Sequence, residues 1–306
     1  MKKILLIFAV FLIAQELSAQ GHPAYQLFNK KGKPVNYGKM VKALEEADII
    51  LFGEQHNNAL NHWLQLQVTK SIHAKHPVTL GAEMFEADDQ VLLDEYLADL
   101  ITENHFITEG KTWKNYKTDY KPLLDYAKEN ELRFIATNIP RRYASLVNKE
   151  GLEGLNQLVE EAKNWIAPLP IEVDLEQSGY KWMIETMGKH AGGDPANIAR
   201  SQASKDATMA HFILKSFETG KKFIHYHGSF HSKDFQGIYH YLLKANLNLK
   251  VMTIASHDQD DIKKLAEENI GIVIEFYHTF VSFVLKHSAA PKRFMLLTIE
   301  TLNIEF

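Results

Sequence analysis

Three stretches of this chain place acidic or imidazole side chains at the end of an apolar run. Glu54 and His56 follow the first run, Glu83 follows the second, and His231 follows the third. Carboxylates and imidazoles can transfer protons, bind a divalent metal ion or hold a carboxylate group of a ligand. The residue types alone leave these three kinds of chemistry open.

Two of the stretches end in the pattern Gly-x-x-His, which spans 53–56 and 228–231. Glycine adopts positive φ without steric cost, so we expect each glycine to turn the chain and fold its histidine back over the end of a strand. In an open α/β sheet, ligands bind outside the carboxyl ends of the strands. The repeated pattern therefore predicts that His56, Glu83 and His231 share one site.

Other polar residues are candidates for supporting roles around this site. Gln202 and Asp206 are four residues apart in a helical pattern, so they share one face, and the alanines around them indicate close packing. Glu83 directly follows an apolar run, and its carboxylate would be costly to bury without a partner. The chain has 15 histidines, most of which must be ordinary surface or core residues, so His62 is a weaker candidate.

Apolar runs of strand length alternate with helical periodicity through most of the chain. This alternation predicts a parallel sheet with helices on both faces. It stops in 151–199, where prolines, tryptophans and glycines interrupt short helical patterns, and we interpret that stretch as an inserted helical cap. We expect strands at 47–53, 77–81, 133–137, near 223 and at 251–254, and helices at 57–76, 88–100, 201–219 and 235–245.

The composition is typical of a globular protein, with 306 residues, 45% hydrophobic and 24% charged, and a formal charge of -4. The charge and the lack of a concentrated basic stretch argue against a nucleic-acid partner. Residues 1–20 have the form of a secretory signal peptide, so we expect 21–306 to be exported, periplasmic or associated with the outer membrane. Because the chain has no cysteine, it is not expected to be a lipoprotein.

Several motifs occur in a characteristic order: FGEQHNN, LGAEMFEADDQ, FIATNIPR, SQASKDATMA and HGSFH. Over about residues 45–255 this order resembles the ChaN-like haem-binding uptake proteins. Their superfamily also includes the Tiki proteins, the TraB proteins and the erythromycin esterases. The resemblance implies a three-layer α/β/α fold with a mostly parallel central sheet and an inserted helical subdomain. It also implies export and haem binding coupled to iron uptake.

The resemblance further implies how haem would be held. A ChaN-type protein holds two cofacial haems at a dimer interface, each iron bound by one tyrosine, so we expect a homodimer when haem is bound. An outer-membrane haem receptor is a further expected partner. A phenolate is a hard anionic ligand that suits ferric haem, and nearby His or Arg side chains would hold the propionates. The candidate haem-contacting residues are His62, Asn138, Arg141, Gln202, Asp206, Tyr116, Tyr120 and Tyr180.

A hydrolase is the alternative function. Enzymatic branches of the superfamily use the same Gly-x-x-His patterns and a following glutamate, and this chain keeps all three. In this alternative Glu54, His56, Glu83 and His231 would be catalytic and would activate water for attack on an ester or amide. They would do so either without a metal or with a divalent metal held by His56, Glu83 and His231. The sequence leaves the choice between a haem carrier and an enzyme open.

Overall fold

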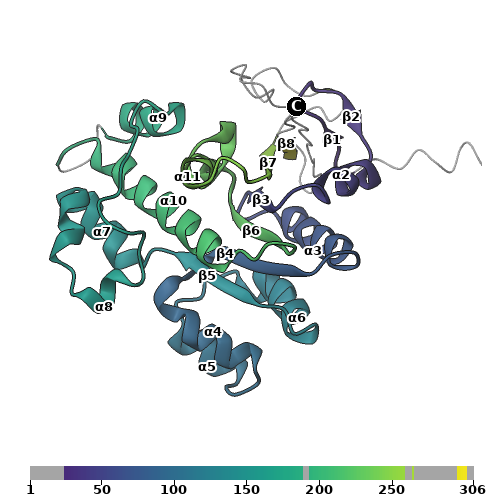
Figure 1. Cartoon of the computed structure of the whole chain (residues 1–306), viewed down its shortest axis with the longest axis horizontal. Helices are drawn as coiled ribbons and strands as arrows, with labels where there is room; N and C mark the ends of the chain where they lie inside the picture. The colour runs from purple at the N-terminus through teal and green to yellow at the C-terminus, as the bar shows by residue number, and fades with distance from the viewer. Residues whose placement is uncertain (1–23, 189–192, 259–263, 265–294, 302–306) are drawn as a thin grey trace, which may run out of the picture.

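The computed structural model describes residues 24–188, 193–258, 264 and 295–301, which form one eight-stranded sheet covered by helices (Figure 1). Its strands are β1 (Leu27–Phe28), β2 (Pro34–Val35), β3 (Ile49–Glu54), β4 (Val78–Glu86), β5 (Phe134–Asn138), β6 (Lys222–Gly228), β7 (Val251–Asp258) and β8 (Met295–Thr301). They lie in the order β2-β1-β8-β7-β3-β6-β4-β5. The strands from β7 to β5 are parallel, which confirms the predicted α/β class with a mostly parallel sheet.

Helices cover both faces of this sheet. They are α2 (Tyr37–Leu44), α3 (Ala59–His73), α4 (Gln90–Leu97), α5 (Glu103–Glu109), α6 (Lys121–Glu129), α10 (Asn197–Ser216) and α11 (Ile238–Ala245). In β3, Ile50 and Phe52 pack in the cluster that includes α2, α3 and α6, whereas Ile49 and Leu51 pack with α10 and α11. A strand buried on both faces reads as a continuous apolar run, which explains the run that precedes Glu54.

The described α-helices between β5 and α10 in the sequence are α7 (Arg141–Glu150), α8 (Glu160–Lys163) and α9 (Ser178–Thr186). Figure 1 shows them grouped at one end of α10. Apolar residues of α7 and α8 pack against Ala207, while Tyr180 of α9 packs against Ala199 and Ala203. These helices interrupt the α/β alternation as expected, and the definition of 151–199 as a subdomain stays a prediction.

Strand β4 is longer than predicted. The expected strand ended at residue 81 and released Glu83 into a loop, but Glu83 lies inside β4, which continues to Glu86. The chain stays extended because the apolar residues Met84 and Phe85 after Glu83 are also buried. The register of β4 against β5 shifts between Ala82 and Glu86, so the ladder is irregular where Glu83 lies.

The predicted signal peptide, 1–20, lies outside the described residues. Among the helices that the structure does describe, none is long and apolar enough to cross a bilayer.

Candidate functional site

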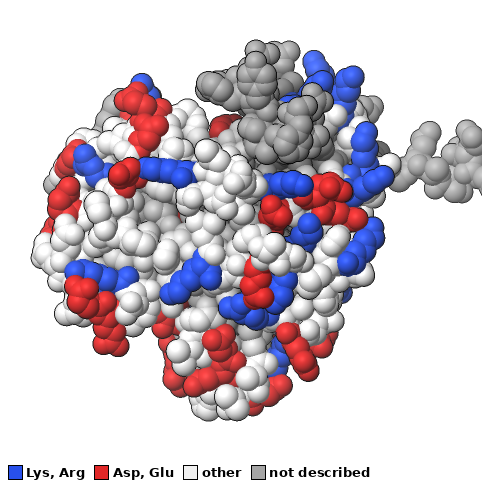
Figure 2. All heavy atoms as spheres, in the orientation of Figure 1, with Lys and Arg blue, Asp and Glu red and all other residues white. Residues whose placement is uncertain are grey.

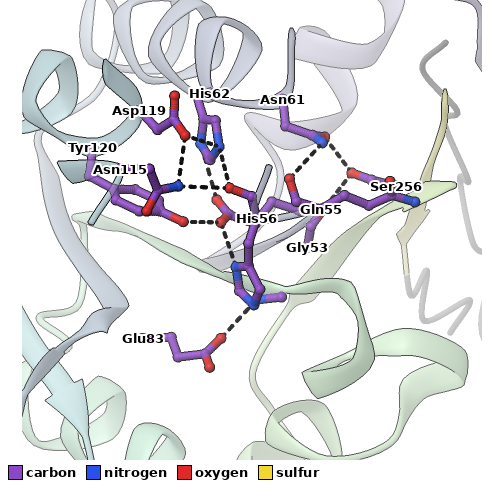
Figure 3. A network of polar contacts seen from close by, with 12 residues as sticks. Gly53, Gln55, His56, Asn61, His62, Glu83, Asn115, Asp119, Tyr120 and Ser256 are labelled. Carbon is purple, nitrogen blue, oxygen red and sulfur yellow. Dashed lines mark hydrogen bonds and ion pairs between the residues drawn. The ribbon is translucent and has the colours of Figure 1, made fainter. Parts of the chain in front are cut away.

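The carboxyl ends of β3, β6 and β4 lie side by side and bring the two Gly-x-x-His patterns together. Strand β6 pairs in parallel with β3 on one side and β4 on the other, with Glu54 opposite Gly228. Nε2 of His231 lies 3.1 Å from Oε1 of Glu83. The His56 ring points toward the same carboxylate (Figure 3). These three side chains therefore do meet at one edge of the sheet.

The glycines of the two patterns provide room for this meeting, and the prediction of a positive φ is wrong. Gly228 has φ −60° and ψ 139°, which any residue can adopt. A Cβ at Gly228 would lie 2.8 Å from Nε2 of His56. A Cβ at Gly53 would lie 2.8 Å from Cα of Ser229. Each glycine thus allows the other pattern to approach closely.

The buried side of the site is a series of contacts through Tyr180, Asp206, His231 and Glu83, which we call the His231 relay. The Tyr180 hydroxyl donates to Oδ2 of Asp206 at 2.7 Å, and Oδ1 lies 2.5 Å from Nδ1 of His231. Nε2 of His231 faces Glu83. Burial alone would lower the pKa of His231, but the two carboxylates outweigh it and raise the pKa to about 10. The ring is therefore an imidazolium at neutral pH.

Glu83 is ionised in this arrangement. Burial would raise the pKa of its carboxyl group, but the positive charges of His231 and His56 hold that pKa well below its usual range. The backbone N–H of Gly228 also donates to Oε2 at 2.8 Å. A carboxylate held in this way is a weak proton acceptor and a fixed negative charge.

A second series of contacts, which we call the His56 relay, runs through Tyr120, Glu54 and His56. As in the His231 relay, a tyrosine hydroxyl contacts a carboxylate, and the carboxylate contacts an imidazole. Oε1 of the buried Glu54 accepts from the Tyr120 hydroxyl at 2.8 Å and lies 2.8 Å from Nδ1 of His56. The His56 side chain is 38% exposed. Burial would lower the pKa of His56, but Glu54 and Glu83 outweigh it and raise that pKa. This relay therefore presents a basic imidazole to solvent.

Further polar residues hold the His56 relay in place (Figure 3). Nε2 of His62 lies 3.2 Å from the backbone oxygen of His56, and the Asn115 amide donates to the same oxygen at 2.9 Å. The Gln65 amide donates to Oε2 of Glu54 at 2.5 Å. His62 and Gln65 are three residues apart in α3, so one helical face supplies both supports.

A cavity of about 550 Å³, which we call the cleft, opens between this edge of the sheet and the helices α7, α9 and α10. It is lined by His56 and Glu83 and by two cations, Arg141 from α7 and Lys205 from α10. Its apolar lining residues are Trp113, Ile139, Ala144, Met183, Met187 and Ile198. An adjoining cavity of about 760 Å³ shares Trp113 and Arg141 with it. Apolar walls with a few placed charges are typical of small-molecule sites.

The family model for haem-binding uptake proteins of the ChaN type, in the Tiki superfamily, matches residues 40–242. This chain belongs to the ChaN family. The structure of Campylobacter jejuni ChaN, described as showing cofacial heme binding, is similar with a TM-score of 0.58 and 18% identity. The similarity covers 75% of this chain and 89% of that one. At this identity it shows the shared fold, which confirms the three-layer α/β/α class.

Two other proteins resemble parts of this ChaN-family chain. Protein RETICULATA-RELATED 5, chloroplastic, from Arabidopsis thaliana is 26% identical over 145 residues, which are 41% of this chain. The chain spans only 19% of the length of that relative. RRSP, a MARTX toxin effector domain from Vibrio vulnificus, has a TM-score of 0.41 and 15% identity, over 76% of this chain and 36% of that one. Likenesses at this level carry no information on function.

None of the tyrosines predicted as haem ligands lines the cleft. Tyr116, Tyr120 and Tyr180 are each 2% exposed, and burial raises the pKa of each phenol, which disfavours a phenolate. The hydroxyls of Tyr120 and Tyr180 donate to Glu54 and Asp206. These two tyrosines support the relays, and a tyrosinate ligand from any of the three is not supported in this cleft.

The other predicted residues divide between the cleft wall and its support. Asn138, Arg141 and Gln202 line the cleft, and the Asn138 amide also donates to the backbone oxygen of Glu83 at 2.9 Å. Asp206, by contrast, is 1% exposed and can reach a ligand only through the His231 relay.

Sequence reasoning missed several residues of the cleft, and Trp113 and Lys205 are the most informative of them. Trp113 lies in a stretch without clear periodicity, and its ring meets the His56 ring edge-on with 4.8 Å between centroids. Lys205 lines the cleft beside Gln202. The helical spacing of three between Gln202 and Lys205 is a signal that could have identified the lysine.

The divalent metal predicted at His56, Glu83 and His231 is not supported. Within the described part of the chain, no group of three or more acidic or imidazole side chains is arranged to hold an ion. Both ring nitrogens of His231 already face carboxylates, those of Asp206 and Glu83. As an imidazolium, His231 has no lone pair to offer a metal.

Proposed function

We propose that this ChaN-family chain is an exported protein that binds haem in the cleft and serves haem or iron uptake. Support comes from the combination of apolar walls and cations in the cleft of a chain whose family is one of haem-binding uptake. Haem is a flat apolar ring with two carboxylates at one edge. It therefore needs apolar contacts along the ring and positive charge at that edge.

We assign Arg141 and Lys205 to the haem carboxylates. Both line the cleft, and neither pairs with an acidic side chain elsewhere in the residues that the structure describes. The face shown in Figure 2 mixes basic and acidic side chains without a large region of one sign. Because distant exposed charges are screened, the cations of the cleft must supply the local attraction for an anionic ligand.

Titration of the purified chain with hemin tests this assignment. The wild type should give a saturable shift of the Soret band. The double variant Arg141→Gln with Lys205→Gln should bind about tenfold or more weakly, because a charge-assisted hydrogen bond contributes about 1.5–3 kcal/mol. Arg133→Gln, at the other end of β5, is the matched control and should leave binding unchanged. A wild type without any Soret shift would contradict the assignment.

The proposed haem-binding function includes export of the chain and its assembly into a homodimer. Residues 1–20 have the form of a cleavable leader, and N-terminal sequencing of fractionated cells would show whether they are removed. We propose a homodimer in the haem-loaded state, by analogy with the cofacial heme binding described for Campylobacter jejuni ChaN, and an outer-membrane haem receptor as the source of haem. Sedimentation with and without hemin checks the dimer; a monomer in both conditions would contradict it.

Hydrolysis of an ester or amide is the second candidate function, favoured by the two relays. His56 is exposed in the cleft with Glu54 behind it, so it would take a proton from an attacking water. Glu83 and His231 would act as fixed charges that orient the water and stabilise developing charge.

Turnover of a panel of esters and peptides tests this second function. If the panel contains a substrate, His56→Ala should lower kcat by about 10²–10⁴, the usual contribution of a general base. His240→Ala, on α11, is the control and should keep activity. Turnover that is unchanged in His56→Ala would show that the reaction takes place elsewhere.

A further inference from the structure

We infer, on the basis of the proposed haem binding, that Nε2 of His56 binds the haem iron in this chain in place of a tyrosinate. Among the described residues, those that line the cleft include no tyrosine, and the tyrosines suggested by the resemblance are buried. Imidazole is another common protein ligand of haem iron. Of the described residues that line the cleft, His56 is the histidine.

The Glu54 carboxylate determines which nitrogen of His56 can bind a metal. Its Oε1 lies 2.8 Å from Nδ1, and because a carboxylate accepts hydrogen bonds, Nδ1 carries the proton. When the ring gives up its second proton, the lone pair is on Nε2, which faces Glu83 in Figure 3, and both side chains line the cleft. Metal-binding histidines usually donate their second N–H to such a partner, which orients the ring and strengthens the ligand.

The residues around His56 hold this orientation. Glu54 accepts from the Tyr120 hydroxyl at 2.8 Å and from the Gln65 amide at 2.5 Å, so the carboxylate has a fixed position. The Trp113 ring packs edge-on against the imidazole from the cleft side. A ligand held by such neighbours loses little conformational entropy when it binds.

If Nε2 of His56 binds the haem iron in place of Glu83, the Glu83 carboxylate still has other partners. Glu83 keeps the backbone N–H of Gly228 at 2.8 Å and Nε2 of His231 at 3.1 Å. The ionised carboxylate would also offset the positive charge of ferric haem nearby. The contact shown in Figure 3 between His56 and Glu83 is therefore compatible with a change of partner at Nε2.

The buried imidazoles near the cleft have both ring nitrogens engaged. His231 lies between two carboxylates. His225 and His227 contact each other at 3.0 Å through Nδ1, and each Nε2 faces a hydroxyl at 2.7 Å. His56 differs from them in its exposure of 38% and in its freedom to change partner at Nε2.

Absorption, EPR and resonance Raman spectra of the hemin-loaded full chain test this ligand. The wild type should show imidazole ligation without iron–phenolate bands. His56→Ala should shift the Soret band and weaken hemin binding about 100-fold, and added imidazole should restore the wild-type spectrum. Glu54→Gln, which alters the support of the ring, should weaken binding about 10- to 100-fold.

Control variants distinguish a His56 ligand from other causes of a change in the spectrum. Tyr116→Phe and His240→Ala should leave the spectrum unchanged. Gly228→Ala keeps the imidazole but places a Cβ 2.8 Å from Nε2, so it should change the spectrum and gives a second test where His56→Ala fails to fold. Hemin that binds with an unchanged spectrum in both His56→Ala and Gly228→Ala overturns the His56 ligand and leaves the proposed haem binding intact. A wild type that binds no hemin overturns both.

Discussion

Replacing Asp206 with alanine is expected to destabilise the folded protein by about 3–5 kcal/mol, because it removes one partner of a buried ion pair. Nδ1 of His231 lies 2.5 Å from this carboxylate, and the two side chains are 5% and 1% exposed. The Tyr180 hydroxyl loses its acceptor at the same time. The imidazolium must then either lose its proton or stay buried with Glu83 alone, and both outcomes cost stability.

Urea unfolding of the wild type and Asp206→Ala near neutral pH measures this difference in the free energy of unfolding. The ion pair between Lys244 and Glu172 on the surface provides the matched control. Glu172→Ala also removes a carboxylate from a cation, but solvent screens that pair, so the unfolding midpoint should hardly move. Equal small effects of the two variants would show that His231 carries no buried charge.

The meeting of the two Gly-x-x-His patterns could be predicted because parallel strands place their carboxyl ends at one edge of a sheet. The apolar runs of β3 and β6 gave sufficient local evidence for buried strands. The contact of His56 with Glu83 depends in addition on the order β3-β6-β4, in which β6 is inserted between strands that are consecutive in sequence. That insertion has no local signal, so the neighbours of each side chain required the structure.

The roles of the tyrosines and glycines could not be predicted from local sequence, because each depends on a distant neighbour. Tyr120 meets a carboxylate 66 residues away and Tyr180 one that is 26 residues away. A tyrosine near a cleft looks the same in sequence whether its hydroxyl faces a ligand or a buried acid. In the same way, Gly228 is required by the His56 ring of another strand and not by its own backbone angles.

The free energy of unfolding is expected to fall by about 1.4 kcal/mol per pH unit between about pH 7 and 9. The pKa of His231 is raised to about 10 in the folded protein, whereas an unfolded imidazole titrates near pH 6.5. Between these two values the folded protein keeps a proton that the unfolded chain has released. The stabilisation from His231 is therefore complete below about pH 6.5 and is lost as the pH rises through about 10.

Urea unfolding across this range, repeated with Asp206→Asn, assigns the slope. The amide cannot hold the His231 proton as the carboxylate does, so the variant should lose less stability per pH unit. His56, whose pKa is also raised, adds to the slope, and His56→Ala removes its share. Acid has the opposite effect on Glu83: its lowered pKa gives stability above about pH 4.3 that is lost as the pH falls. A wild-type curve that stays flat between about pH 7 and 9 would mean that His231 is neutral in the fold, and Glu83 would then lack one of the two positive charges that lower its pKa.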